Sequence, residues 1–210
     1  MFQARVLGQF PKQGKDTMFP LSVIEAAVER TLEPGDEIEL GADIARFGNA
    51  ETVIYRRAGP VFRLHDTANK EDSVAVEGRI TRAYKELAPI AIKIDGVGIG
   101  GSGPVDHLRD EGLPIVDVQA GGRANDPELY VDQRAEMFWD LKGRFEDGDI
   151  DLDPEDELVQ EQLSSLTFKL PKGRVRVVSK EELSVSPDRA DALAMCNYAA
   201  PDETAVFDVW

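Results

Sequence analysis

The sequence predicts a mixed α/β domain built on a five-stranded sheet, from a strand meander and a later crossover. Runs rich in β-branched and aromatic residues are separated only by turn-length segments, which favours an antiparallel meander: 38–45, 51–58 and 60–67. Further along, the apolar runs 90–95 and 113–119 flank a helical stretch, as in a right-handed parallel crossover. Meander and crossover together give five strands flanked by helices.

The expected helices begin and end at recognisable signals. Helices are predicted at four further places, where apolar residues recur at helical spacing or a start signal precedes them: 22–33, 70–87, 127–145 and 186–199. Ser22 is the N-cap candidate of the first, and Ser186-Pro187 begins the last. The runs LTFKL and RVRVVS on either side of 171–173 predict an added hairpin.

Length and composition indicate one soluble domain. The chain has 210 residues, with 42% hydrophobic and 30% charged residues, which is ordinary for a globular protein. No apolar run approaches the roughly 18 to 20 residues of a membrane span, so we expect a soluble, intracellular protein without a membrane partner. The main domain is predicted over 37–200, with a lead at 1–36 and a tail at 201–210.

The charge is strongly acidic. A net charge of -16 disfavours unaided binding of nucleic acid, because proteins that grip DNA alone usually present a basic surface. Eight of the twelve residues at 146–157 are Asp or Glu, so the total overstates repulsion elsewhere. Part of this run imitates a calcium loop, but Pro154 stands where glycine is needed, and a solvated acidic surface is expected instead.

Few residues in the chain are suited to zinc or disulfide chemistry. Cys196 is the single cysteine, and only His65 and His107 accompany it as nitrogen or sulfur ligands. Cys196 falls on the apolar face of the last helix, which indicates core packing. Any bound metal is therefore expected to have oxygen ligands.

Four aspartates are the candidate ligands. Asp43 lies within an apolar strand, where an ionised carboxylate is costly unless a cation or several donors receive it. Asp95 closes the strand at 90–95, the end at which open α/β sheets place their sites. Asp188 and Asp191 share a face of the last helix near its start. Taken singly, each also fits a turn, capping or helix-terminal role.

Together the four carboxylates indicate a centre for Mg²⁺ or Mn²⁺, which prefer oxygen ligands. Two such ions about 4 Å apart suit phosphodiester cleavage without a protein general base. Which of Asp188 and Asp191 lies closer to the metal stays open.

At these residues the chain resembles the nuclease domain of phage and prophage large terminase subunits. Three segments resemble its motifs in order and separation: GADIARFGNAETVIYRR at 41–57, IKIDGVGIGGSGPVDHL at 92–108 and SPDRADALAM at 186–195. The stretch at 120–141 resembles the region after the second motif, and RVLGQFP at 5–11 resembles the junction that follows the family's ATPase. The resemblance covers most of the chain.

The resemblance implies an RNase H-like fold and a two-metal endonuclease that cuts double-stranded viral DNA during packaging. It assigns metal binding and catalysis to Asp43, Asp95, Asp188 and Asp191. It also implies partners: a terminase ATPase domain, the small terminase subunit and the portal or procapsid, in the cytoplasm of an infected bacterial host. No phosphate-binding GxxxxGK[ST] motif occurs, so 1–36 is interpreted as a linker from an ATPase domain that this chain lacks.

Other readings remain beside this one. The fold could serve as an assembly or DNA-binding module that is inactive alone. Alternatively, the glycines from Gly98 to Gly103 fit GxGxxG, with Asp117 placed as in a dinucleotide-binding fold. Five basic residues are candidate DNA contacts, with an ordinary solvated hairpin as the competing interpretation for the last four: Arg46, Lys169, Lys172, Arg174 and Arg176.

Overall fold

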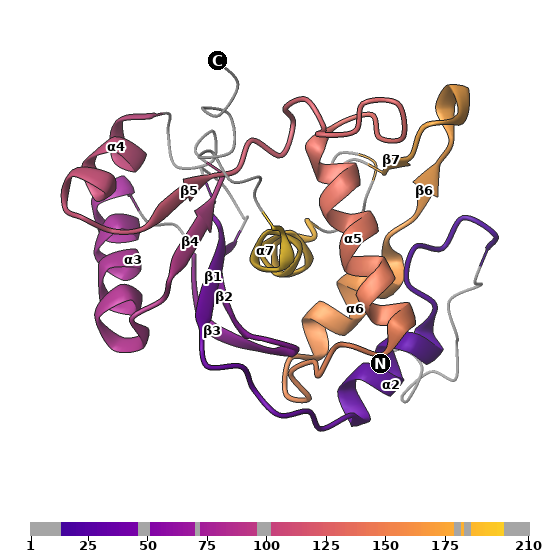
Figure 1. The fold of residues 1–210 in the computed structure, drawn as a ribbon, viewed down its shortest axis with the longest axis horizontal. Coiled ribbons are helices and arrows are strands. Elements are labelled where there is room, and N and C mark those ends of the chain that lie inside the picture. Colours follow the sequence, from indigo (N-terminus) through magenta and orange to yellow (C-terminus); the bar gives the residue numbers. More distant parts are fainter. Residues whose placement is uncertain are drawn as a thin grey trace, which may run out of the picture.

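The central sheet has five strands in the order β3-β2-β1-β4-β5 (Figure 1). The computed structural model describes residues 14–45, 51–69, 72–95, 102–178, 182 and 186–199. The strands are β1 (Ile38–Asp43), β2 (Glu51–Ala58), β3 (Val61–Asn69), β4 (Ala91–Ile94) and β5 (Ile115–Asp117). β2 pairs antiparallel with β1 and β3, and β4 pairs parallel with β1 and β5. The predicted mixed sheet is confirmed.

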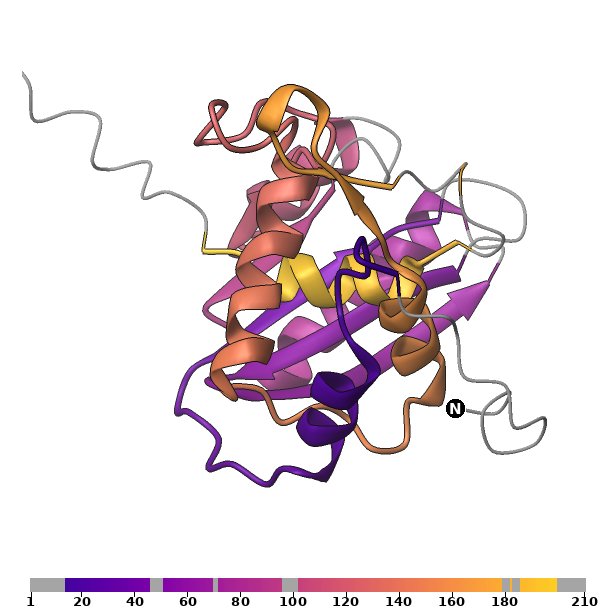
Figure 2. The ribbon, with the colours of Figure 1, turned by 90° about the vertical axis from the view of Figure 1, so that its right-hand side faces the viewer.

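Helices cover both faces of the sheet. On one face lie α3 (Ser73–Leu87) and α4 (Ser102–Asp110), and on the other lies α7 (Asp188–Asn197). Outside α7 lie three more helices: α2 (Leu21–Glu29), α5 (Gln133–Asp147) and α6 (Glu157–Ser165). Figure 2 shows α7 between the strands and the orange helices α5 and α6. The last helix is therefore buried from all sides.

The alternation along β1 separates two hydrophobic cores. Leu40, Ala42 and Ile44 pack into the core under α3 and α4, so Gly41 and Asp43 face α7. A Cβ atom at Gly41 would lie 2.3 Å from the backbone nitrogen of Cys196 and 2.4 Å from the carbonyl oxygen of Ala192. Glycine at this position lets the backbone of α7 rest directly on the strand.

Two expected helices differ in extent from the observed ones. α2 ends at Glu29, because Arg30 is extended and its guanidinium donates to the carbonyl of Ile150 at 2.7 Å. α5 begins at Gln133, well after residue 127, because the Asp132 side chain accepts from the Ala135 nitrogen at 2.8 Å and caps the helix there. Ahead of this cap, Tyr130 instead forms a β-bridge to Val175.

The run at 149–153, expected to form a solvated acidic surface, is partly buried, and burial extends to Asp156. Asp151 and Asp156 are each only 3% exposed. Asp151 accepts from the guanidinium of Arg63 at 2.7 Å and from the backbone nitrogen of Leu32 at 3.0 Å. Buried carboxylates of this kind satisfy donors that would otherwise lack a partner. Part of the negative charge therefore lies inside the fold.

The added hairpin is confirmed. It consists of β6 (Phe168–Lys169) and β7 (Arg176–Val177), with a 3-10 turn, η1 (Pro171–Gly173), between them. Lys172 and Gly173 have φ angles of 54° and 83°, which the tight turn requires. Among the described helices, none has the length and apolar character needed to cross a membrane.

Candidate metal centre

Asp43 and Asp95 lie at the same edge of the sheet. The parallel register of β1 and β4 joins Gly41 to Lys93 and Ala42 to Ile94, so Asp43 and Asp95 are the next residues along the two strands. Asp43 is 8% exposed. Each aspartate comes two positions after a residue that faces α7, Gly41 on β1 and Lys93 on β4, so strand alternation points both aspartates to the same side of the sheet as α7. The strand-borne aspartates of the prediction are thus neighbours.

The first turn of α7 lies at this same edge. The Cys196 Sγ atom donates to the carbonyl of Glu39, near the start of β1, at 3.4 Å. At the other end of the helix, Asp188 Oδ2 accepts from the backbone nitrogen of Glu51 at 3.0 Å. α7 therefore runs antiparallel to β1, and its N-terminus meets the carboxyl end of that strand. Asp188 and Asp191 are 5% and 7% exposed.

The two helix aspartates contact different neighbours. Asp188 faces the start of β2 and also accepts from the hydroxyl of Ser186. Asp191 accepts from Arg134 Nε of α5 at 2.9 Å, and that guanidinium stacks on Phe138 with 4.8 Å between Cζ and the ring centroid. Although the spacing of three was expected to put both aspartates on one helix face, tertiary contacts direct Asp188 to the start of β2 and Asp191 to Arg134 of α5.

A buried lysine anchors the other end of α7. The Lys93 ammonium donates to the carbonyl of Cys196 at 3.1 Å and lies 3.0 Å from a carboxylate oxygen of Glu39. Burial lowers the pKa of Lys93 to about 8 and raises the pKa of the Cys196 thiol to about 12. Cys196 is fully buried, which confirms its expected packing role.

The donor set at this edge fits a hard cation by its chemistry. Its candidate ligands are carboxylates, which suit Mg²⁺ or Mn²⁺. Over the described ranges, no three His, Cys, Asp or Glu side chains form a group that could hold a metal ion. Segments 46–50 and 96–101, directly after Asp43 and Asp95, lie outside those ranges. The strand register and the start of α7 therefore put these aspartates along one sheet edge, and the described residues alone do not form a ligand shell.

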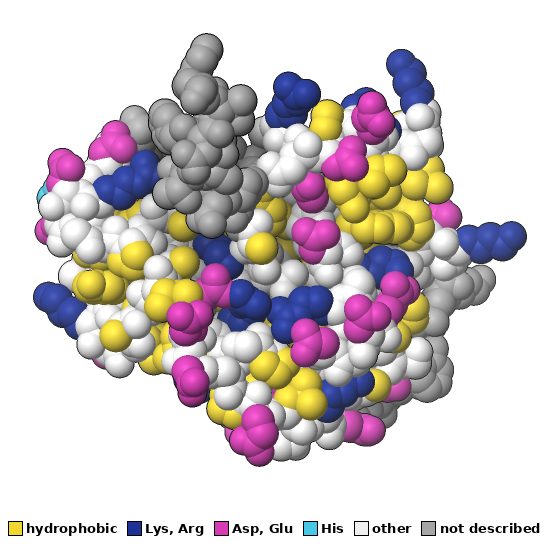
Figure 3. Space-filling model, viewed as in Figure 1, with side chains coloured by type: hydrophobic (Ala, Val, Ile, Leu, Met, Phe, Trp, Pro, Cys, Tyr) yellow, Lys and Arg dark blue, Asp and Glu magenta, His cyan; other side chains and the backbone are white. Residues whose placement is uncertain are grey.

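The candidate DNA contacts are only partly available. Arg46 lies outside the described residues. Lys169 and Arg176 both pair with Glu182, at 2.7 and 2.8 Å. Arg174 donates to a backbone carbonyl at 3.4 Å, and Lys172 is exposed at the turn. Figure 3 shows Lys and Arg side chains interspersed with Asp and Glu over the visible face.

Most of the glycine-rich motif considered for dinucleotide binding falls outside the described residues. Residues 96–101 lie outside the described ranges. The sheet is mixed, with an antiparallel meander on one side, whereas a dinucleotide-binding fold has a mostly parallel sheet.

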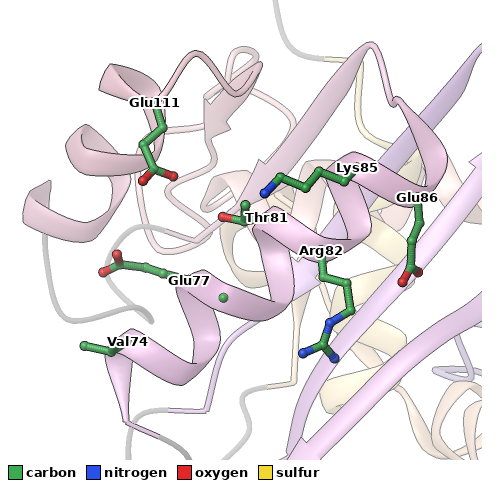
Figure 4. A pocket seen from close by; sticks show the side chains of 8 residues that line it. Val74, Glu77, Thr81, Arg82, Lys85, Glu86 and Glu111 are labelled. Atoms are coloured by element: carbon green, nitrogen blue, oxygen red, sulfur yellow. The ribbon is translucent and has the colours of Figure 1, made fainter.

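A hollow of about 570 Å³ lies between α3 and α4 on the face away from α7, lined by Glu77, Thr81 and Arg82 among others (Figure 4). It is separate from the carboxylate edge.

Sequence reasoning missed the residues that hold the helix carboxylates in place. Arg189 stands inside the last motif, beside Asp188, and its position next to a candidate ligand was an available signal. Arg134 and Gln162 also contact α7, through Asp191 and through the backbone of its first turn. No local pattern marks these two residues, because their partners are 57 and 27 positions away.

The fold matches solved nuclease domains of large terminase subunits. The nuclease domain of subunit gp2 of bacterial virus Sf6 gives a TM-score of 0.72 at 16% identity, covering 88% of this chain and 100% of that chain. A mutant form of that domain with manganese and beta-thujaplicinol gives 0.77 at the same identity and coverage. The large terminase nuclease of thermophilic phage G20c with bound magnesium gives 0.66 at 14% identity, covering 88% and 98%.

No protein-family model and no curated protein matches the sequence. The structural likeness confirms the predicted RNase H-like architecture, and the chain has the fold of terminase nuclease domains.

Proposed function

We propose that this chain is a metal-dependent endonuclease that cuts double-stranded viral DNA during genome packaging. One observation supports the proposal: two adjacent parallel strands end in aspartates at the sheet edge where a buried helix begins with two more, in a fold shared with terminase nucleases. One of the matched structures, from Sf6, contains manganese and another, from G20c, contains magnesium, which fits an all-oxygen donor set here.

Asp43, Asp95 and one or both of Asp188 and Asp191 would hold two Mg²⁺ or Mn²⁺ ions. When bound, such ions supply activation of water and charge stabilisation at the leaving oxygen of a phosphodiester. Buried carboxylates of like charge raise one another's energy unless a cation receives them, so the edge favours divalent ions.

The protein's own donors orient the carboxylates. The Glu51 nitrogen and the Ser186 hydroxyl fix Asp188, and Arg134 fixes Asp191. Because Arg134 already neutralises part of the charge of Asp191, we assign the stronger metal contact to Asp188. An Asp188→Asn substitution should weaken Mn²⁺ binding more than Asp191→Asn does, as isothermal titration calorimetry would show. Equal losses would contradict this assignment.

DNA affinity must come from local cations or from partners, because the net charge is -16. Lys172 and Arg174, on the hairpin, are the contacts we propose, with Arg46, Lys169 and Arg176 as further candidates. A packaging ATPase domain, the small terminase subunit and the portal or procapsid would supply local concentration of DNA in the host cytoplasm. The same charge supports a second candidate, an assembly module that is silent in isolation.

The proposal is tested by cleavage of supercoiled plasmid with Mg²⁺, Mn²⁺, Ca²⁺ or EDTA. Asp95→Asn is compared with Asp106→Asn, which makes the same charge change at an exposed site on α4. We expect nicking and linearisation with Mg²⁺ or Mn²⁺, reduced more than about a hundredfold in Asp95→Asn only. Cleavage that survives Asp95→Asn contradicts the site. No cleavage by any variant, with Mn²⁺ still bound, supports the assembly module.

A further inference from the structure

The first turn of α7 is capped by a side chain from another helix. Pro187 occupies the N-cap position, where it provides no side-chain hydrogen bond. Gln162 of α6 accepts instead, from the backbone nitrogens of Arg189 at 2.9 Å and Ala190 at 3.0 Å. Its amide nitrogen donates to the carbonyl of Ser186 at 3.1 Å. The buried Gln162 amide thus contacts the residue before the N-cap and the first turn of the helix that follows it.

Because Gln162 caps the helix, Asp188 is not needed as the capping residue. Helix N-termini carry nitrogens without intrahelical partners, and a nearby aspartate often receives them. Here Gln162 does so, and the Asp188 carboxylate accepts from Glu51 and Ser186 at the sheet edge. The helix start is therefore stabilised without drawing this carboxylate back onto its own backbone.

Side-chain hydrogen bonds of Arg189 also hold the first turn of α7 in place. Its Nε atom lies 3.1 Å from Glu51 Oε2, and its Nη1 atom lies 2.6 Å from Asp156 Oδ1. Burial disfavours its charge, but the hydrogen bonds to Glu51 and Asp156 outweigh this and raise the pKa of Arg189. Asp156 in turn caps α6 by accepting from Val159 at 3.1 Å. Arg189 thereby links the starts of β2, α6 and α7.

We propose that Gln162 and Arg189 are positioning residues that set the first turn of α7 against the carboxyl end of β1. Through this turn they fix where Asp188 presents its oxygens to a divalent ion. The inference rests on the proposed metal-dependent function. Groups that orient metal ligands typically change metal affinity by about 10- to 100-fold when removed.

The test compares two substitutions at opposite ends of α7. Gln162→Met keeps side-chain length and removes the cap. Asn197→Leu keeps side-chain shape and removes the bond from Arg144 Nη1, 2.7 Å long, at the far end. Mn²⁺ affinity is measured by electron paramagnetic resonance, and stability by thermal unfolding. Both variants should unfold at lower temperature, but only Gln162→Met should bind Mn²⁺ at least about tenfold more weakly.

The outcomes separate the inference from the function beneath it. If the wild-type chain binds Mn²⁺ through Asp43 and the Mn²⁺ affinity of Gln162→Met is within twofold of the wild-type affinity, the positioning role alone is overturned. Wild-type chain that binds no Mn²⁺ overturns the metal site and the positioning role together. If Gln162→Met fails to fold, Arg189→Lys replaces it, since this variant keeps the charge but cannot hydrogen-bond Glu51 and Asp156 at the same time. Affinity unchanged in Arg189→Lys then overturns the inference.

Discussion

The close approach of α7 to β1 depends on Gly41, and Gly41→Ala is the sharpest perturbation of it. The added Cβ would lie 2.3 Å from the Cys196 nitrogen and 2.4 Å from the Ala192 oxygen. Ordinary contact begins near 3.4 Å, so strand and helix must separate by about 1 Å. Because both neighbours are backbone atoms, no side-chain rotation relieves the clash.

The expected loss follows from this geometry. Overpacking a core costs about 1–3 kcal/mol when side chains adjust. A backbone clash in a fully buried layer belongs at the upper end, about 3 kcal/mol. For a chain of this size, each kcal/mol lowers Tm by about 2–4 °C, so Tm should fall by about 6–12 °C. The same displacement carries Asp188 away from Asp43, so Mn²⁺ affinity should fall as well.

Circular dichroism melting and Mn²⁺ titration measure the two effects. The control is Gly78→Ala within α3, where a Cβ meets nothing within 4 Å. That change should stabilise the helix by about 0.5–1 kcal/mol, because alanine favours helix more than glycine does. A Gly41→Ala chain that melts within 2 °C of the wild type would refute the argument for contact between α7 and β1.

Two further predictions concern other buried or paired groups. Tyr55→Phe removes the hydroxyl bonded to the buried carboxylate of Asp156 and should lower stability by about 1–3 kcal/mol in urea unfolding; a loss below about 0.5 kcal/mol would contradict the bond. The hydrogen bond from His107 to Glu77, 2.7 Å long, raises the pKa of His107, so this pair stabilises the fold at low pH and the contribution is lost as pH rises through the folded-state pKa. Histidine NMR titration should show this pKa above 6.5 and a decrease in Glu77→Gln, and no decrease would exclude Glu77 as the cause.

Local signals determined most of the secondary structure. The meander, the crossover strands and the last helix were predictable because alternation, apolar runs and turn residues act over a few neighbouring positions. The aspartates were recognisable for the same reason, since Asp43 interrupts an apolar strand and Asp95 closes one. Strand direction then placed both at one sheet edge, as the parallel register of β1 and β4 bears out.

The extent of α5 could not be read from local pattern alone. The stretch after residue 127 has helical character, but Asp132 caps the helix, and Tyr130, ahead of this cap, forms a bridge to Val175 just before β7. Similarly, Asp151 reads as solvent-exposed in an acidic run, and a partner 88 positions away, Arg63, makes it an internal acceptor. Tertiary contacts override local preference in both cases.

The sequence by itself determined which elements form, which carboxylates stand at their ends and where charge falls along the chain, but not which charges are buried. Tertiary structure decided how the last helix is held over the sheet: the contact at Gly41, the cap from Gln162 and the pairing of Asp191 with Arg134. The physical reason is range. Strand and helix patterns arise between residues a few positions apart, whereas the contacts that orient Asp188 join segments separated by up to 138 positions.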